Sequence, residues 1–385
     1  MKRIILIIAS VLALVSVYPV QLSVAAKNEV SAEAYVLTEA STGTVLDGEN
    51  ADMRLNCGYL SKLMSLLLIA EDIETGKYGL DTELTVSESV RGTKGAVIWL
   101  EPNDSISVGE LLKSVIIGNA NDAMTVLAEA SERSIEDFVS RMNSEAFDMG
   151  LRDTVFFSPY GYSDEREYST AHDIAEICRM LSRFEFLRPY FCTWRDFVRG
   201  GKTELVNENV LSRTYERHIG FKACHSDDSG FCIAEGGVNP SGTRCIAVVL
   251  GASDAEASFS AAKKLINHGF SDYKVTATMF PDEMLMPIKV RGGEESAVQI
   301  RLKNQSRIVV PRAVKELGTV TVLPEYLSAP VKKEQRIGMA AFYSGKELVC
   351  EADIVATEDV ERLSFKYIFG EIAVKLLGRR CLVCA

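Results

Sequence analysis

The chain has 385 residues, more than one hydrophobic core usually organises, so we expect two domains. Hydrophobic residues make up 47% of it and charged residues 25%, which is typical of a folded globular protein. The formal net charge of −11 argues against a nucleic-acid partner, because phosphate binding needs a basic surface. No metal or other cofactor is expected, since the four scattered histidines show no ligand spacing and are interpreted as ordinary surface or core residues: His172, His218, His225 and His268.

The first segment, residues 1–26, has the physical properties of a secretory signal peptide. Two basic residues precede an apolar run over residues 4–17, and small residues close the segment. A retained membrane anchor is the alternative, but Pro19 and Gln21 interrupt the apolar run. In both cases the chain is predicted to be exported.

The nine cysteines are an odd number, so at least one is unpaired. Cys381 and Cys384 have CxxC spacing but stand alone near the C-terminal end. We expect mostly free thiols, and the sequence assigns no disulfide pairing.

Residues 30–273 mix extended and helical patterns. A hairpin is predicted to turn at residues 41–43, and a polar cap at Ser169-Thr170 is predicted to begin a helix. A second helical run is interrupted at residues 118–121. The predicted strands cover residues 34–37, 44–46, 231–234 and 245–250, and the predicted helices begin near residue 59 and cover residues 111–130, 173–183 and 255–269.

Residues 274–360 show short extended segments instead, which predicts a small all-β domain, interpreted as a β-sandwich. The last segment, residues 361–385, turns helical over residues 363–377, with apolar residues on one side and basic residues around them. It is too short and too charged to span a bilayer but suits a helix lying on a membrane surface. A helix docked on the β domain is the alternative.

The most informative stretch is Tyr59-Leu60-Ser61-Lys62, at the predicted start of a helix. Penicillin-recognising enzymes place a nucleophilic serine three residues before a lysine at such a start. One turn of helix then brings the hydroxyl and the amine to the same face. Lys62 is present here, but Tyr59 stands where the serine is expected.

Further segments follow in an order that supports the same comparison. Residues 118–123, Gly-Asn-Ala-Asn-Asp-Ala, stand where a Ser-x-Asn block is expected, and residues 220–224, Gly-Phe-Lys-Ala-Cys, stand where a Lys-Thr-Gly block is expected. With the segments at 157–161, 168–175 and 207–211, the chain resembles the D-alanyl-D-alanine carboxypeptidases. These are low-molecular-mass penicillin-binding proteins of the serine peptidase family S11.

The resemblance implies a fold and a set of partners. It implies an α/β (α+β) β-lactamase/transpeptidase-like domain with an antiparallel sheet flanked by helices, followed by the small all-β domain. It also implies a protein of peptidoglycan maturation at the outer face of the cytoplasmic membrane. Its expected partners are peptidoglycan stem peptides or β-lactams, and the membrane surface through the C-terminal helix.

The resemblance also implies roles for single positions. The lysine of the first block, Lys62, takes part in proton transfer. Asn121 holds the peptide, and Lys222 binds the terminal carboxylate. The positions of the nucleophile, of the relay serine and of the carboxylate-binding threonine are substituted, by Tyr59, Asn119 and Ala223 respectively, and Cys224 replaces the glycine.

These substitutions predict lost or severely impaired hydrolysis. The phenol of Tyr59 carries its oxygen farther out than a serine hydroxyl, and an asparagine has no accessible pKa for proton relay. Ser61 should be turned about 100° from Lys62 around a helix. Two alternatives stay open: an active carboxypeptidase with Cys57 or Tyr59 as nucleophile, and a non-catalytic module that binds the cell wall or a partner protein, the latter through the β domain.

The three retained polar residues, Lys62, Asn121 and Lys222, have two possible explanations. They could hold parts of the domain together through buried hydrogen bonds, or the lysines could still attract carboxylate-bearing stem peptides. We favour the structural explanation.

Overall fold

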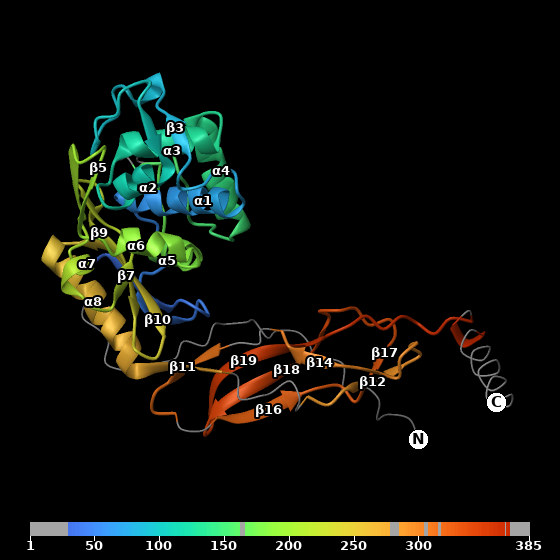
Figure 1. Ribbon diagram of the computed structural model, residues 1–385. Coiled ribbons are helices and arrows are strands. Elements are labelled where there is room, and N and C mark those ends of the chain that lie inside the picture. Colours follow the sequence, from blue (N-terminus) through green and yellow to red (C-terminus); the bar gives the residue numbers. More distant parts are fainter. Residues whose placement is uncertain are drawn as a thin grey trace, which may run out of the picture. The chain divides into compact units, whose positions relative to one another are not determined.

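The computed structural model describes residues 30–161, 166–277, 285–303, 307–314, 317–365 and 367–369 (Figure 1). The predicted signal peptide and most of the predicted C-terminal helix lie outside the described residues. The described residues form two compact units, the larger within residues 30–277 and 307–313 and the smaller within residues 285–303 and 314–369.

An antiparallel sheet forms the centre of the larger unit. Its strands run in the order β2-β1-β10-β9-β7, and β8 also pairs with β9. The strands are β1 (Ala34–Glu39), β2 (Val45–Glu49), β7 (His218–Gly220), β8 (Ala223–Ser226), β9 (Gly230–Val238) and β10 (Arg244–Ala252). The predicted hairpin and both predicted buried strands are therefore confirmed.

Both faces of this sheet are buried. Successive side chains of a strand point to opposite faces, so Val36 of β1 joins the core cluster that contains α1 (Lys62–Glu74) and α5 (Ala171–Leu181), while Leu37 joins the cluster that contains α8 (Ala255–Asp272). The sheet thus lies between α8 on one side and a group of helices that includes α1 and α5 on the other (Figure 1).

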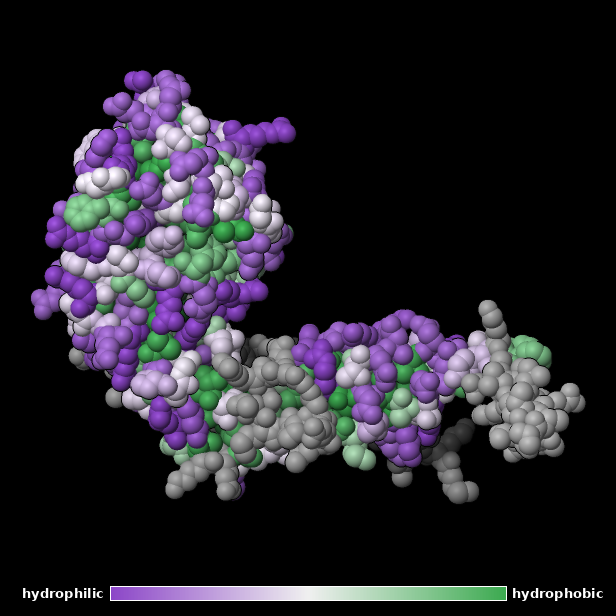
Figure 2. All heavy atoms as spheres, viewed as in Figure 1, coloured by the Kyte–Doolittle hydropathy of each residue, from purple (hydrophilic) through white to green (hydrophobic). Residues whose placement is uncertain are grey.

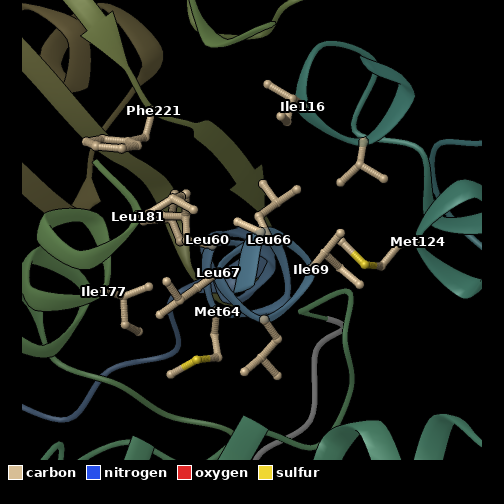
Figure 3. Packing of buried hydrophobic residues seen from close by; sticks show 14 of the residues in the cluster. Leu60, Met64, Leu66, Leu67, Ile69, Ile116, Met124, Ile177, Leu181 and Phe221 are labelled. Carbon is tan, nitrogen blue, oxygen red and sulfur yellow. The ribbon is translucent and has the colours of Figure 1, made fainter. Parts of the chain in front are cut away.

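Helix α1 is buried along residues 62–70. A 3₁₀ turn, η1 (Gly58–Ser61), precedes it, and apolar side chains leave it in all directions. Figure 3 shows this helix end-on, with Ile69 pointing towards Met124 and Leu67 towards Ile177. Burial on all sides is expected for a helix inside a core.

The predicted long helical run is two helices, α2 (Val108–Ile116) and α3 (Asn121–Ser131), as its interruption indicated. The predicted cap is confirmed, because the hydroxyl of Thr170 accepts a hydrogen bond from the Asp173 N–H at 2.9 Å. The remaining elements of this unit are α4 (Ile135–Asp148), η2 (Glu88–Val90), η3 (Glu185–Leu187), α6 (Arg188–Phe191), α7 (Leu211–Thr214), β3 (Glu83–Thr85), β4 (Ser105–Ser107), β5 (Arg195–Val198) and β6 (Thr203–Val206).

The smaller unit is a β domain, and the strand pair next to the expected boundary at residue 274 belongs to the larger unit. Strand β11 (Tyr273–Ala277) pairs with β15 (Arg307–Pro311), and both belong to the larger unit. This pairing joins segments about thirty residues apart, which sequence patterns do not reveal.

Two further sheets lie in the smaller unit, with strand orders β13-β12-β17 and β14-β19-β18-β16. Their strands are β12 (Ile288–Arg291), β13 (Ala297–Val298), β14 (Ile300–Leu302), β16 (Gly318–Val322), β17 (Tyr326–Ser328), β18 (Arg336–Ser344) and β19 (Glu347–Ala356). Within the described ranges, no helix has the length and apolar character needed to cross a membrane.

Candidate active site

The first motif lies at the entry to α1. Tyr59 and Lys62 are three residues apart on the 3₁₀ turn η1 and the first residue of α1, a spacing at which side chains eclipse one another. The Lys62 Nζ accordingly lies 4.4 Å from the centroid of the Tyr59 ring. The amine therefore meets the face of the aromatic ring and not the phenol oxygen.

Lys62 is completely buried, and its Nζ donates a hydrogen bond to the Tyr160 carbonyl at 3.1 Å. Burial, followed by the nearby charge of Lys222, lowers the pKa of Lys62 well below its ordinary value. No described carboxylate forms an ion pair with this amine. The side chain is thus a buried base that contacts a carbonyl and a ring.

The two serines that flank Lys62 point elsewhere. The Ser61 hydroxyl donates to Glu167 Oε1 at 2.6 Å, and the Ser65 hydroxyl donates to the Pro159 carbonyl at 2.9 Å. Ser61 therefore lies on another side of the turn from the Lys62 amine, as its position in the sequence indicated. Neither hydroxyl is hydrogen-bonded to that amine.

Cys57, one of the two alternative nucleophiles, is only 1% exposed. Burial raises the pKa of its thiol to about 12, and the neighbouring Glu167 carboxylate adds to the effect. A thiol in this environment is protonated at neutral pH and is a poor nucleophile. Burial likewise raises the pKa of the Tyr59 phenol.

The second motif surrounds the start of α3. Asn121 is the first residue of that helix, and its Nδ2 donates to the Lys94 carbonyl at 2.7 Å. A Cβ built on Gly95 would lie 2.6 Å from this Nδ2 and 3.8 Å from the Tyr59 hydroxyl oxygen. The Tyr59 side chain therefore reaches from η1 to the loop that holds Asn121.

Asn119, at the position of the relay serine, has a left-handed backbone with φ of +57° and is 5% exposed. Its Oδ1 is buried and accepts no hydrogen bond from the described part of the chain. Asparagine tolerates this backbone conformation better than most residues, and its amide has no accessible pKa with which to relay a proton.

The third motif contributes Lys222, which is 4% exposed. Its Nζ donates to the carbonyls of Val115 and Ile116, at 3.0 and 3.3 Å. These carbonyls lie at the C-terminal end of α2, where helices leave acceptors unsatisfied and favour a positive charge. Burial lowers the pKa of Lys222 to about 8, although Glu208 opposes the shift.

Ala223 does not join the same group. It packs in the core cluster on the α8 side of the sheet, while its strand neighbour Cys224 joins the cluster of α1. The structure therefore brings Tyr59, Lys62, Asn121 and Lys222 to one region, with Cys224 close to them, and leaves Ala223 on the other face.

The segment at 157–161 encloses this region. The Tyr160 hydroxyl lies 2.7 Å from the Thr125 hydroxyl of α3, and its carbonyl accepts from Lys62. Gly161 has φ of +76°, and a Cβ there would lie 2.1 Å from the Gly58 carbonyl oxygen. Only glycine allows the segment to press so closely against the start of η1.

Two participants in this region were missed in the sequence. Glu167 connects the turn η1 to the segment at 157–161. Its Oε1 accepts a hydrogen bond from Ser61, and its Oε2 accepts one from the Phe157 N–H at 3.0 Å. Cys224 was noted only as a replaced glycine. Its place two residues after Lys222, within the third motif, was the available signal. A surface depression elsewhere is lined by residues that include Leu187, Phe191 and Phe221. Phe221 is the one residue of the three motifs in this lining.

Comparisons with known proteins agree with this geometry. The D-alanyl-D-alanine carboxypeptidase family (peptidase S11) matches residues 21–254, and the C-terminal domain of penicillin-binding protein 5 matches residues 273–362. The D-alanyl-D-alanine carboxypeptidase DacF of Bacillus subtilis is 29% identical over 339 residues, which cover 87% of each chain. DacC of Escherichia coli is 28% identical over 352 residues, covering 89% of this chain and 87% of the relative.

Solved structures lead to the same result. Penicillin-binding protein 5 from Haemophilus influenzae superposes with a TM-score of 0.82 at 25% identity, covering 88% of this chain and 100% of that one. Because one family matches more than half of the chain and its C-terminal partner domain matches the β domain, the chain belongs to the D-alanyl-D-alanine carboxypeptidase family of peptidoglycan metabolism.

Proposed function

We propose that this protein works in peptidoglycan maturation without an efficient acyl-enzyme step, as a cell-wall-binding or scaffolding member of its family. The observation that carries the proposal is the Tyr59 ring against the Lys62 amine, at the place from which a serine hydroxyl would attack. The hydroxyls of Ser61 and Ser65 are committed to other acceptors.

The remaining positions support the same conclusion. Asn119 cannot relay a proton, and Lys222 is bonded to the end of α2. In a serine protease, loss of the nucleophile alone lowers turnover by about a million-fold, and further losses in the same group add little. A conventional serine route is therefore disabled at its first step.

The decisive experiment is acylation by a fluorescent penicillin, followed by intact-mass measurement. We expect no covalent adduct on the wild-type protein, and no release of D-alanine from a stem pentapeptide, under conditions that fully label an active relative. An adduct mapped to Tyr59 or Cys57 would establish the alternative of an atypical nucleophile and end this proposal.

Substitution separates the contributions of the three positions. Tyr59→Ser alone is expected to remain unlabelled, because Asn119 independently disables the proton relay. The double variant Tyr59→Ser, Asn119→Ser is the matched comparison, and slow labelling is expected only there. Adding Ala223→Thr should change little, because Ala223 packs on the other face of the sheet. Efficient labelling of the single variant would show that Tyr59 is the whole defect.

The proposal includes export and attachment to the membrane surface. The described part of the C-terminal segment supports attachment, since Phe365 and Phe369 are 83% and 65% exposed and their rings stack. Figure 2 shows apolar side chains at this end of the described chain. Truncation after Val360 should release the protein from membrane fractions. Unchanged fractionation would show that this helix is not the anchor.

A second candidate function, partner binding through the β domain, has its own support. Strand β16 is an edge strand, and Val320 and Val322 on it are 53% and 60% exposed. Exposed apolar edges are common sites of protein association. Retention of an envelope protein by the full chain, lost in a Val320→Lys, Val322→Lys variant that still folds, would favour this function.

A further inference from the structure

Three buried thiols gather at the junction between η1 and the β8–β9 hairpin. Cys57, Cys224 and Cys232 are 1%, 5% and 1% exposed. The Cys224 thiol donates to the Cys57 carbonyl, with 3.7 Å between sulfur and oxygen. Cys57 Sγ in turn lies 3.4 Å from the Ser61 hydroxyl. The cluster therefore contacts the turn that carries Tyr59.

Two of the three thiols face each other across a strand pair. Cys224 of β8 and Cys232 of β9 are directly opposed in the antiparallel register. Opposed residues of such a pair have Cα atoms about 4.5–5.5 Å apart, and disulfides span Cα separations of about 4.4–6.8 Å. A disulfide between them needs no rearrangement of the strands.

The two thiols also differ in the reduced state. The neighbouring Cys232 sulfur and burial raise the pKa of Cys224 well above its ordinary value, whereas the neighbouring Cys224 thiol lowers the pKa of Cys232. As a thiol, Cys232 donates to the Ser229 carbonyl at 3.3 Å. Cys232 is therefore the sulfur that ionises first, an attacking thiol beside a resolving one.

We propose that Cys224 and Cys232 form a reversible redox pair that a hydroperoxide oxidises to a cross-strand disulfide. The Cys232 thiolate attacks one peroxide oxygen, the O–O bond breaks, and Cys232 becomes a sulfenic acid while hydroxide leaves. The Cys224 sulfur then attacks the sulfenic sulfur, the S–O bond breaks and water leaves. The released hydroxide takes up the proton lost from Cys232, so two thiols and one hydrogen peroxide yield one disulfide and two waters.

Access and consequence both follow from the fold. Strand β8 is bonded to β9 alone, so opening of this edge admits an oxidant as small as hydrogen peroxide. Oxidation consumes the Cys224 S–H that donates to the Cys57 carbonyl, so the disulfide alters the support of the turn that carries Tyr59. The redox pair does not depend on whether the protein acylates penicillin.

The test uses the full reduced chain, treated with hydrogen peroxide and alkylated before mass measurement. We expect the loss of two hydrogens, reversed by a dithiol reductant. Trypsin leaves Cys224 and Cys232 in one peptide, because no lysine or arginine lies between them. Cleavage before Asp227 or Asp228 separates the two cysteines, so a linked pair of peptides identifies the bond.

Matched variants distinguish this pair from the other thiols. Cys224→Ser should prevent the disulfide and leave a sulfenic acid on Cys232 that a 1,3-dione captures, and Cys232→Ser should prevent both. Cys57→Ser, which removes the third thiol of the cluster, should form the disulfide as the wild type does. A crosslink that involves Cys57 would overturn the assignment, as would an unlinked pair at a peroxide dose that oxidises the half-buried Cys350 in wild-type protein.

Discussion

The larger unit buries basic side chains in two places, and their pKa values are shifted in opposite directions. In the candidate active site, Lys62 and Lys222 contact backbone carbonyls, and burial lowers the pKa of both. In the core beside β7 and β9, His218 Nδ1 lies 2.8 Å from Glu235 Oε1. In the second place a carboxylate is hydrogen-bonded to the cation, whereas in the first place the described hydrogen bonds of the two amines all go to backbone carbonyls.

The histidine has acceptors at both ring nitrogens, since Nε2 lies 3.1 Å from the Phe191 carbonyl. Both nitrogens donate only if the ring is protonated. Burial alone lowers the pKa of His218, but the Glu235 carboxylate and its hydrogen bond outweigh burial and raise it above its ordinary value of 6.5. A buried cation therefore keeps its charge where a carboxylate is hydrogen-bonded to it. Where backbone carbonyls alone accept its hydrogen bonds, it loses the charge more easily.

The largest expected effect tests the paired site. His218→Leu leaves the Glu235 carboxylate buried with only Asn209 as a described side-chain partner, and should lower the free energy of unfolding by about 3–5 kcal/mol. Denaturant titration measures the loss. The double variant His218→Leu, Glu235→Leu is the control and should be nearly as stable as the wild type. If the double variant is as unstable as the single one, the loss of stability does not come from leaving the Glu235 charge unpaired.

The second effect tests the unpaired site through pH. The folded pKa of Lys222 is about 8 and its ordinary value is 10.5, so the folded state binds fewer protons than the unfolded state between these values. Stability contributed by this group therefore rises with pH across that window, by on the order of 3 kcal/mol. The difference in unfolding free energy between the wild type and Lys222→Met should grow in favour of the wild type from pH 8 to 10. A constant difference would show that Lys222 keeps its charge.

The smallest effect is the opposite slope at the paired site. Burial raises the pKa of Glu235 above 4.5, and the pKa of His218 is raised above 6.5, so the folded state binds more protons than the unfolded state. The stability from this pair is complete below about pH 4.5 and declines as pH rises through the folded pKa of His218. Relative to the double leucine variant, the wild type should lose stability between pH 5 and 8. A gain over that range would contradict the assigned charges.

Much of the scaffold was predictable from local patterns. The Thr170 cap, the break between α2 and α3 and the paired strands β9 and β10 all followed from residue types and short spacings. The motif residues Tyr59 and Lys62 were found through the family resemblance, and their spacing at a helical start predicted that the two side chains lie close together.

Features that depend on distant pairing were not predictable. The pairing of β11 with β15 and the opposition of Cys224 to Cys232 both depend on how strands pair. His218 was interpreted as an ordinary residue, since its partner Glu235 lies seventeen positions away on the neighbouring strand. Sequence patterns specify neighbours along the chain, and these contacts arise only when strands are laid side by side.

The hydrogen bonds from Lys222 to the C-terminal end of α2 have a consequence for ligand binding. The family resemblance assigns the ammonium of Lys222 to the terminal carboxylate of a peptide. Here the ammonium donates hydrogen bonds to two carbonyls of the protein itself. An incoming carboxylate competes with them for the three donors of the ammonium, and a carboxylate that takes their place removes the closing contact of the last turn of α2. Ligand binding at Lys222 is therefore coupled to fraying of α2. A carboxylate ligand that binds there should speed up amide hydrogen exchange at the C-terminal end of α2.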